Sequence, residues 1–316
     1  MGIRAGHMLV TIFGGGGFLG RYVAQELLSR GMRVRVAERN PADAVRVKPL
    51  GGLGQTQLTY ADIRKPETVA HAVAGADAVV NLVGILSGDF DDFHRQGAAN
   101  VAQAAATAGV KTLVHISAIG ADVDSASAYG RSKGEGEEAV RKAFPGATII
   151  RPSIVFGRED QFTNRFANMI RMTPVLPVIS GKTKFQPVYV VDVARAIAVA
   201  VADPAAHAKK TYELGGPQVL SMAEINQWLA QAIGHDPAVV PVPDLVSEWM
   251  ARLAGWLPGA PITLDQWKML QKDNVVAPKA KGLDALGVSP TPLAAVADQW
   301  LVQYRKHGRF TSSAKV

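Results

Sequence analysis

Short apolar runs alternate with segments of helical periodicity through the first half of the chain. The runs are rich in β-branched residues and predict strands at Met8–Phe13, Val34–Ala37, Gln57–Tyr60, Ala78–Leu82, Thr112–Ser117 and Ala147–Arg151. Apolar residues at helical spacing predict helices between them, from Gly20 towards Gly31 and at Pro66–Val73, Phe90–Ala108 and Ala126–Phe144. This alternation is typical of an α/β fold with a doubly wound parallel sheet covered on both faces.

A glycine-rich loop follows the first predicted strand directly. Glycines at intervals of three allow a tight turn, let a pyrophosphate approach the backbone, and let the next helix pack closely on the strand. Free N–H groups at the start of that helix then face the phosphate. Strand, loop and helix in this order predict a Rossmann-type dinucleotide site rather than a structural turn. The residues of this loop expected to contact the cofactor are Gly14, Gly17, Phe18, Leu19 and Gly20.

The pattern changes after Arg151, where prolines become frequent and short strand-like pieces mix with helices. Helices are expected at Val190–Ala202, Met222–Ile233 and Leu293–Lys306. We expect residues 1–151 to form the nucleotide-binding domain, with segments returning from the second half of the chain. Residues 152–308 are expected to form a smaller α/β lobe that covers the cofactor and provides the substrate site, and residues 309–316 a disordered tail.

Composition limits the classes of function. The 316 residues include no cysteine, which excludes disulfides and thiolate chemistry, and the seven histidines form no ligand-like pairs, so no metal site is expected. The net charge of +7 favours anionic partners such as cofactor phosphates or an anionic membrane surface. Nucleic acid is not expected, because the late basic residues are not interleaved with stacking aromatics. Without an apolar signal region or an uninterrupted apolar span, the protein is expected to be cytoplasmic.

The ends of the second to fourth predicted strands carry candidate cofactor contacts. Glu38 is suited to the two ribose hydroxyls of NAD, whereas Arg39, with Arg21 in support, is suited to the 2′-phosphate of NADP. Because the turn at Asn40 follows Arg39, NADP(H) is the preferred cofactor and NAD(H) the alternative. Asp62 is expected to accept from the adenine amine and Ile63 to cover the ring. Residues Leu82, Val83 and Gly84 follow the fourth strand at the edge where ligands of such folds bind.

Three residues form a candidate catalytic site. Ser117 closes the fifth strand, Tyr129 follows on a predicted helix, and Lys133 lies one turn further on the same face. The lysine ammonium is expected to lower the pKa of the tyrosine phenol and to bind the nicotinamide ribose, while Ser117 bonds a substrate oxygen. In a reduction the cofactor would give hydride to carbon, and Tyr129 would give a proton to oxygen. The alternative is an exposed helical pair without function.

With these motifs the chain resembles the extended, atypical short-chain dehydrogenase/reductases over almost its whole length. Arg151–Gly157 matches the strand and loop beside nicotinamide in that superfamily, and Val188–Ala194 matches its later signature. This resemblance implies cofactor contacts at Pro152 and Ser153. The stretches AFPGATIIRPS, FGREDQFTNRFANM and FQPVYVVDVARAI resemble, more specifically, the nucleotide-binding accessory subunits of respiratory complex I in their bacterial form.

The second resemblance implies tightly held NADP(H) that serves largely as a structural element, and partners in the peripheral arm of complex I beside the inner face of the membrane. One position departs from the extended family. Many members carry an asparagine in the region where this chain reads Phe93-His94-Arg95-Gln96. A proton relay that uses that asparagine is therefore not expected here. Two functions therefore stay open: an accessory or assembly subunit, or a free-standing NAD(P)-dependent oxidoreductase or epimerase, for example in quinone biosynthesis.

Apolar residues at helical spacing also recur late in the chain, at Leu245, Trp249, Met250, Leu253 and Trp256. The preferred interpretation is a helix that packs on the second lobe. The alternative is a surface for a membrane or a partner helix.

Overall fold

The computed structural model describes residues 8–254 and 262–310. The chain divides into two compact units, which are described separately. Unit 1 consists of Met1–Pro152, Val190–Leu214 and Ala277–Ser289, and unit 2 of Ser153–Tyr189, Gly215–Val276 and Pro290–Val316. Within the described ranges, the structure contains no helix that combines the length and the apolar character needed to cross a membrane.

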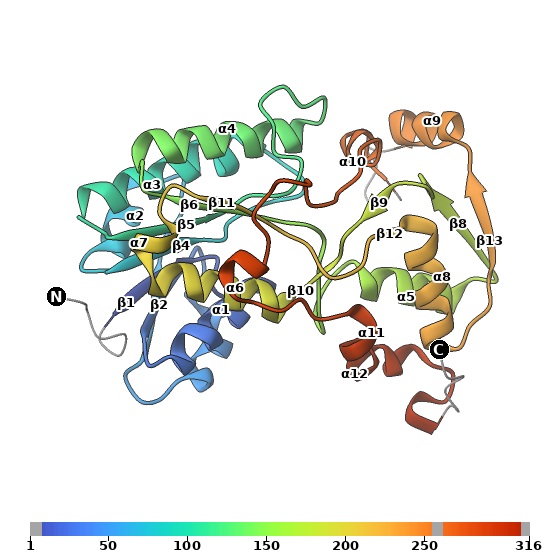
Figure 1. The fold of residues 1–316 in the computed structure, drawn as a ribbon, viewed down its shortest axis with the longest axis horizontal. Coiled ribbons are helices and arrows are strands. Elements are labelled where there is room, and N and C mark those ends of the chain that lie inside the picture. Colours follow the sequence, from blue (N-terminus) through green and yellow to red (C-terminus); the bar gives the residue numbers. More distant parts are fainter. Residues whose placement is uncertain (1–7, 255–261, 311–316) are drawn as a thin grey trace. The chain divides into compact units, whose positions relative to one another are not determined.

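Unit 1 is built on a seven-stranded sheet in the order β11-β6-β5-β4-β1-β2-β3 (Figure 1). Every neighbouring pair is parallel. The chain runs outward from β1 in both directions, and this reversal is where ligands of doubly wound sheets bind. The predicted Rossmann-type fold is confirmed. The six strands expected from the sequence, β1 to β6, lie within one residue of their expected bounds, whereas the seventh strand, β11, was not predicted. The strands are β1 (Leu9–Phe13), β2 (Arg33–Glu38), β3 (Thr56–Tyr60), β4 (Ala78–Asn81), β5 (Thr112–Ile116), β6 (Thr148–Pro152) and β11 (Thr211–Leu214).

Helices cover both faces of this sheet, as Figure 1 shows. Helices α1 (Phe18–Ser29) and α6 (Val190–Ala202) pack together on one face. Helices α2 (Pro66–Val73), α3 (Gly97–Thr107) and α4 (Ala128–Ala143) lie side by side on the other. Because both faces are covered, the central strands are buried almost throughout rather than at alternate positions; β4, for example, is buried at every position.

The prediction of a single α-helix over Phe90–Ala108 is wrong for the first part of this segment. Asp91–Gln96 forms a π-helix, and regular α-helical geometry begins only at Gly97. The Gly97 N–H bonds the Asp92 carbonyl, five residues back. A β-carbon at Gly97 would lie 2.5 Å from the side chain of Ile63, so this segment also packs unusually closely on the loop after β3.

Unit 2 has a separate core around helices α5 (Thr163–Met172) and α8 (Met222–Ile233), as predicted for the second of these. Its strands form three two-stranded sheets: β7 (Val155–Phe156) with β10 (Val188–Tyr189), β9 (Lys184–Phe185) with β12 (Leu220–Ser221), and β8 (Val175–Ile179) with β13 (Ala238–Val242). Helices α9 (Asp244–Ala254) and α10 (Leu264–Met269) follow β13 along the chain.

Two expectations for the end of the chain are corrected. The single helix expected at Leu293–Lys306 is broken into α11 (Leu293–Val296), α12 (Asp298–Leu301) and a 3-10 turn at Val302–Tyr304. Tight hydrogen bonds to the third residue back, such as Trp300 N–H to the Ala297 carbonyl at 3.1 Å, interrupt the α-helical ladder. A 3-10 turn at Gly308–Phe310 replaces the start of the expected tail, whose residues 311–316 lie outside the described part.

A buried carboxylate ties α4 to the sheet. Glu137 is 1% exposed and accepts two bonds from Arg151 of β6, at 2.7 and 2.8 Å, and one from Arg141 at 3.0 Å. Arg151 continues to Glu213 of β11 at 3.4 Å, and Glu213 accepts from the backbone N–H of Ala277. The network therefore joins the fourth helix, two strands and a returning segment of unit 1.

Removing Glu137 should destabilise unit 1 strongly. Glu137→Ala leaves the partly buried Arg151 guanidinium without its main partner, which should lower the free energy of unfolding by about 3 kcal/mol. Arg141→Ala is the matched control, because that side chain is 43% exposed and should contribute less than about 1 kcal/mol. Urea unfolding of both variants measures the difference; equal, small losses would show that the network contributes little.

Candidate functional site

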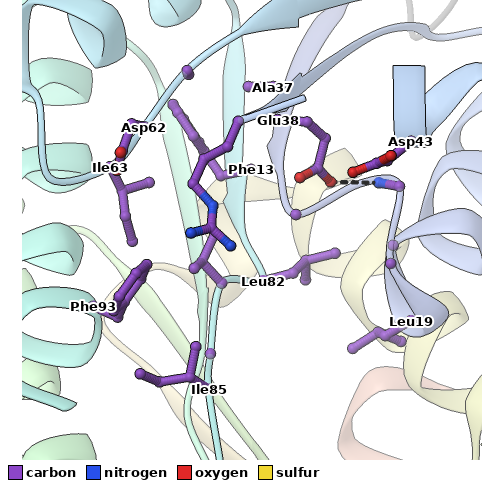
Figure 2. Close-up of a pocket in the computed structure, with 18 of the residues that line it drawn as sticks. Phe13, Leu19, Ala37, Glu38, Asp43, Asp62, Ile63, Leu82, Ile85 and Phe93 are labelled. Atoms are coloured by element: carbon purple, nitrogen blue, oxygen red, sulfur yellow. Dashed lines mark hydrogen bonds between the residues drawn. The ribbon is translucent and has the colours of Figure 1, made fainter. Parts of the chain in front are cut away.

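A cavity of about 420 Å³ opens at the carboxyl ends of β1, β2 and β4 (Figure 2). Figure 2 shows Asp62, Ile63 and Phe93 on one side, with Glu38 and Asp43 on the other. The following predicted cofactor residues line it: Gly14, Gly17, Phe18, Leu19, Gly20, Glu38, Arg39, Asp62, Ile63, Leu82, Val83 and Gly84. The structure thus brings together, within unit 1, residues from four separate strand ends.

The glycine loop forms the floor of this cavity by an unusually close backbone contact. Gly14 has φ +79°, a conformation that disfavours side chains, and its carbonyl accepts from the Gly17 N–H at 3.2 Å. A β-carbon at Gly20 would lie only 2.2 Å from the Gly14 oxygen. The first turn of α1 therefore lies directly on the loop, which leaves the N–H groups at the start of the helix available to an anionic ligand.

Glu38 holds the glycine loop in place. Its Oε1 accepts from the Gly16 N–H at 2.8 Å, the dashed line in Figure 2. Burial raises the pKa of this carboxyl, and the bond from Gly16 opposes that shift. Glu38 was predicted as a ribose ligand; the structure adds a contact to the loop that the sequence did not suggest.

Asp62 is engaged by a neighbour. Its two carboxylate oxygens accept from Arg64 at 3.0 and 2.6 Å, and these bonds hold the pKa of Asp62 below its usual range. The guanidinium of Arg64 in turn lies 4.9 Å from the centre of the Phe93 ring, and that of Arg39 lies 5.5 Å from the same ring. An adenine amine at Asp62 would thus share the carboxylate with Arg64.

The candidate catalytic lysine is buried beside the end of β5. The Lys133 Nζ lies 3.4 Å from the Ile116 carbonyl, one residue before Ser117, and 5.9 Å from the centre of the Tyr129 ring. Ser117 is buried, and its Oγ has no hydrogen-bond partner among the described residues. A β-carbon on Gly84, at the cavity wall, would lie 3.1 Å from Nζ. Lys133 therefore connects the cavity wall with the end of β5.

The expected activation of Tyr129 is not observed. Burial raises the pKa of Tyr129 to about 12, whereas the sequence led us to expect a lowered value. Burial also lowers the pKa of Lys133 to about 8, although the nearby Glu137 opposes this shift. Both groups are withdrawn from water, so each favours its neutral form, and the lysine does not offset the desolvation of the phenol.

His94 lies on the π-helix at Asp91–Gln96, and both of its ring nitrogens are engaged. Nε2 lies 3.0 Å from the Ile85 N–H and accepts from it, so Nδ1 carries the proton and donates to the Ser132 Oγ at 2.9 Å. Burial lowers the pKa of His94 to about 3. The imidazole is thus a neutral link between the loop after β4 and helix α4.

Five predicted cofactor residues do not line the cavity: Arg21, Tyr129, Lys133, Pro152 and Ser153. Arg21 lies on α1, and its Nε is buried and has no hydrogen-bond partner among the described residues. Pro152 ends β6 in unit 1, and Ser153 begins unit 2, where its Oγ bonds Asn274 at 3.0 and 2.6 Å. Their predicted contacts to a cofactor remain predictions.

Sequence reasoning missed several residues of the cavity wall: Phe13, Gly16, Ala37, Asp43, Ala61, Ile85 and Phe93. Most of these residues are adjacent in the sequence to predicted contacts. Including the residues before and after each predicted contact would have found them. Phe93 and Asp43 lie on segments that return to the cavity from outside the strand ends, and only the structure places them there.

The sequence profile of the NAD-dependent epimerase/dehydratase family matches residues 10–215, which contain all strands of the unit 1 sheet from β1 onward. The chain belongs to this family.

Relatives of this family member include a subunit of a respiratory enzyme. This chain is 36% identical over 317 residues to the mitochondrial NADH dehydrogenase (ubiquinone) 1 alpha subcomplex subunit 9 of Arabidopsis thaliana. The alignment covers 95% of this chain and 79% of the relative. This chain is also 27% identical to the ceramide reductase of Caulobacter vibrioides, covering 91% and 87%. The fold matches an NADPH-dependent quinone oxidoreductase from Escherichia coli in complex with NADPH, with TM-score 0.74 and 22% identity, covering 90% and 97%.

Lys133 should give this epimerase/dehydratase-family protein a measurable dependence of stability on pH. Its pKa is 10.5 when exposed and about 8 in the fold, so between these values the unfolded chain binds more protons and stability rises with pH. Below pH 8 the buried ammonium is a constant penalty. Lys133→Met should therefore be more stable than the wild type at pH 7, with the difference shrinking towards pH 10.5. Chemical denaturation at several pH values measures it; a constant difference would contradict the prediction.

Proposed function

We propose that the protein is an NADP(H)-binding accessory subunit of a respiratory NADH:quinone oxidoreductase. The observation that carries the proposal is the combination of a cavity lined by the glycine loop and four strand ends with 36% identity, over 95% of the chain, to a subunit of that enzyme. Burial raises the pKa of Tyr129 and so disfavours its phenolate, which supports a nucleotide that is held rather than turned over.

The preference for NADP(H) over NAD(H) rests on Arg39. This residue lines the cavity at the end of β2, where dinucleotide folds read the adenosine ribose. Among the described residues Arg39 has no salt-bridge partner, so its charge is available to a 2′-phosphate. Glu38, the residue that would favour NAD(H), is bound to the glycine loop instead, which reduces its capacity to accept from ribose.

Replacing Arg39 should therefore change cofactor selectivity. Arg39→Ala should weaken NADPH binding at least about tenfold, because a charge-assisted bond to phosphate is lost, and should change NADH binding little. Titration calorimetry of the nucleotide-depleted protein with both cofactors measures the two affinities, and Arg21→Ala serves as control because Arg21 does not line the cavity. An equal loss for the two cofactors would remove the 2′-phosphate assignment.

A docking surface for the larger enzyme is offered by unit 2. The predicted packing of the apolar helix onto its lobe holds for one face only: Ser247 and Ala251 of α9 are buried, but Leu245, Trp249 and Leu253 are 67%, 55% and 67% exposed. Val239 and Val240 of the preceding strand are also exposed. Trp256, the last residue of the predicted stripe, lies outside the described residues. Exposed apolar side chains at this density mark interaction surfaces.

This surface would seat the protein on subunits of the peripheral arm, at the inner face of the membrane. The chain itself carries a net charge of +7, which favours an anionic membrane surface beside the docking site. A peripheral location on the cytoplasmic side needs no spanning helix, in keeping with the described helices.

A second candidate function is a free-standing NAD(P)-dependent reductase. The observation that favours it is the buried, unpartnered Ser117 Oγ beside Lys133, a donor placed to bond a substrate oxygen. The identity to a reductase, 27%, is lower than that to the respiratory subunit. In this function Tyr129 supplies the proton, so Tyr129→Phe abolishes turnover while nucleotide stays bound.

Affinity capture from membranes in mild detergent separates the two functions. Tagged wild-type protein should recover core subunits of the respiratory enzyme together with about one NADP(H) per chain, measured by mass spectrometry. Trp249→Glu should lose those subunits, because a charge would be buried in the interface. Tyr129→Phe should keep both.

Leu53→Glu is the matched control for the docking surface, since Leu53 is fully exposed in unit 1. It should recover the same subunits as the wild type. Recovery of the protein alone, with nucleotide oxidised or reduced in a Tyr129-dependent manner, would favour the reductase.

A further inference from the structure

The ring of Phe93, at the wall of the nucleotide cavity, lies near two guanidinium groups. The Arg64 Cζ lies 4.9 Å and the Arg39 Cζ 5.5 Å from the ring centre. Both distances are within the range of a cation–π interaction, in which the electron-rich face of the ring attracts the cation. Figure 2 shows the Phe93 ring on the cavity wall near Ile63 and Ile85.

The two arginines differ in what else they bind. Arg64 is neutralised by Asp62, through two side-chain bonds of 3.0 and 2.6 Å. Arg39, by contrast, forms no salt bridge with any described carboxylate, and it lines the cavity whereas Arg64 does not. Of the two cations at the ring, Arg39 is thus the one that lines the ligand space and forms no salt bridge among the described residues.

Phe93 itself is held firmly. Its ring packs against the buried cluster that includes Ile63, Val69 and Val101. The π-helix at Asp91–Gln96 carries it, and the close contact between Gly97 and Ile63 fixes the end of that helix. The ring is therefore a fixed surface, while the arginine side chain has many rotamers to lose.

We propose that Phe93 determines cofactor specificity by holding the Arg39 guanidinium in the position where it meets the 2′-phosphate of NADP(H). The inference rests on the proposed function, in which Arg39 binds that phosphate. A guanidinium held in advance loses less rotamer freedom when it binds, so the phosphate gains affinity. NAD(H) lacks this phosphate and gains nothing from the ordering of Arg39, so the effect of Phe93 appears in the ratio of the two affinities.

The test compares Phe93→Leu, which keeps an apolar side chain but removes the ring face, with Phe93→Tyr, which keeps both. Dissociation constants of the nucleotide-depleted, full-length protein are measured for NADPH and for NADH. Phe93→Leu should weaken NADPH binding about three- to tenfold, the range of a cation–π interaction at a partly exposed site, and change NADH binding less than about twofold. Phe93→Tyr should retain the wild-type ratio.

A structural role alone would give a different result. If Phe93 only packed in the wall, or stacked on the adenine common to both cofactors, Phe93→Leu would weaken NADPH and NADH equally, and the inference would be overturned. Thermal unfolding of the variants identifies a general loss of stability, in which case the smaller change Phe93→Met replaces Phe93→Leu and the same ratio decides.

The double variant Arg39→Ala/Phe93→Leu distinguishes this inference from the function on which it rests. If Phe93 acts through Arg39, adding Phe93→Leu to Arg39→Ala should leave the NADPH:NADH ratio unchanged. If Arg39→Ala alone leaves the wild-type ratio, the 2′-phosphate assignment itself fails. A third outcome is that Arg39→Ala lowers the ratio of NADPH to NADH affinity, and that Phe93→Leu lowers this ratio by the same factor in the wild type and in the Arg39→Ala variant. The two residues then act independently, and only the inference about Phe93 fails.

Discussion

Two helices of unit 1 lie closer to their neighbours than a β-carbon would allow, and both halves of the candidate site depend on these contacts. A β-carbon at Gly20 of α1 would lie 2.2 Å from the Gly14 carbonyl, and one at Gly136 of α4 would lie 2.1 Å from the His94 carbonyl. The first contact places the start of α1 under the nucleotide cavity. The second brings the helix of Tyr129 and Lys133 against the π-helix that carries His94. Any larger residue would push these elements apart, because backbone atoms cannot yield as a side chain can.

The chemistry at the end of β5 follows from how completely α4 is buried there. Glu137 is stabilised as an anion because three hydrogen bonds from two arginines satisfy it. One turn earlier Lys133 has no such partner, so burial lowers its pKa, and the phenol of Tyr129 is held neutral for the same reason. Burial also lowers the pKa of His94, to about 3, so its imidazole is neutral at pH 7.

The two units carry different physical properties. Unit 1 buries its apolar residues on both faces of the sheet and presents a cavity at the ends of its strands. Unit 2 leaves one face of α9 and part of β13 exposed, although such side chains would be stabilised by burial. The family to which the chain belongs accounts for the nucleotide-binding fold of the first unit.

The sequence by itself determined six of the seven strands of unit 1, their parallel arrangement and most of the cavity lining, from Gly14 to Gly84. These features follow from local periodicity and from glycine spacing, which are properties of neighbouring residues. Tertiary structure decided the rest. Burial reversed the expected pKa shift of Tyr129, the partner Arg64 engaged Asp62, and a π-helix replaced the first part of an expected helix and placed Phe93 beside Arg39. Each of these outcomes depends on residues distant in the chain or on the loss of water around a group. Neither effect can be predicted from the pattern of neighbouring residues.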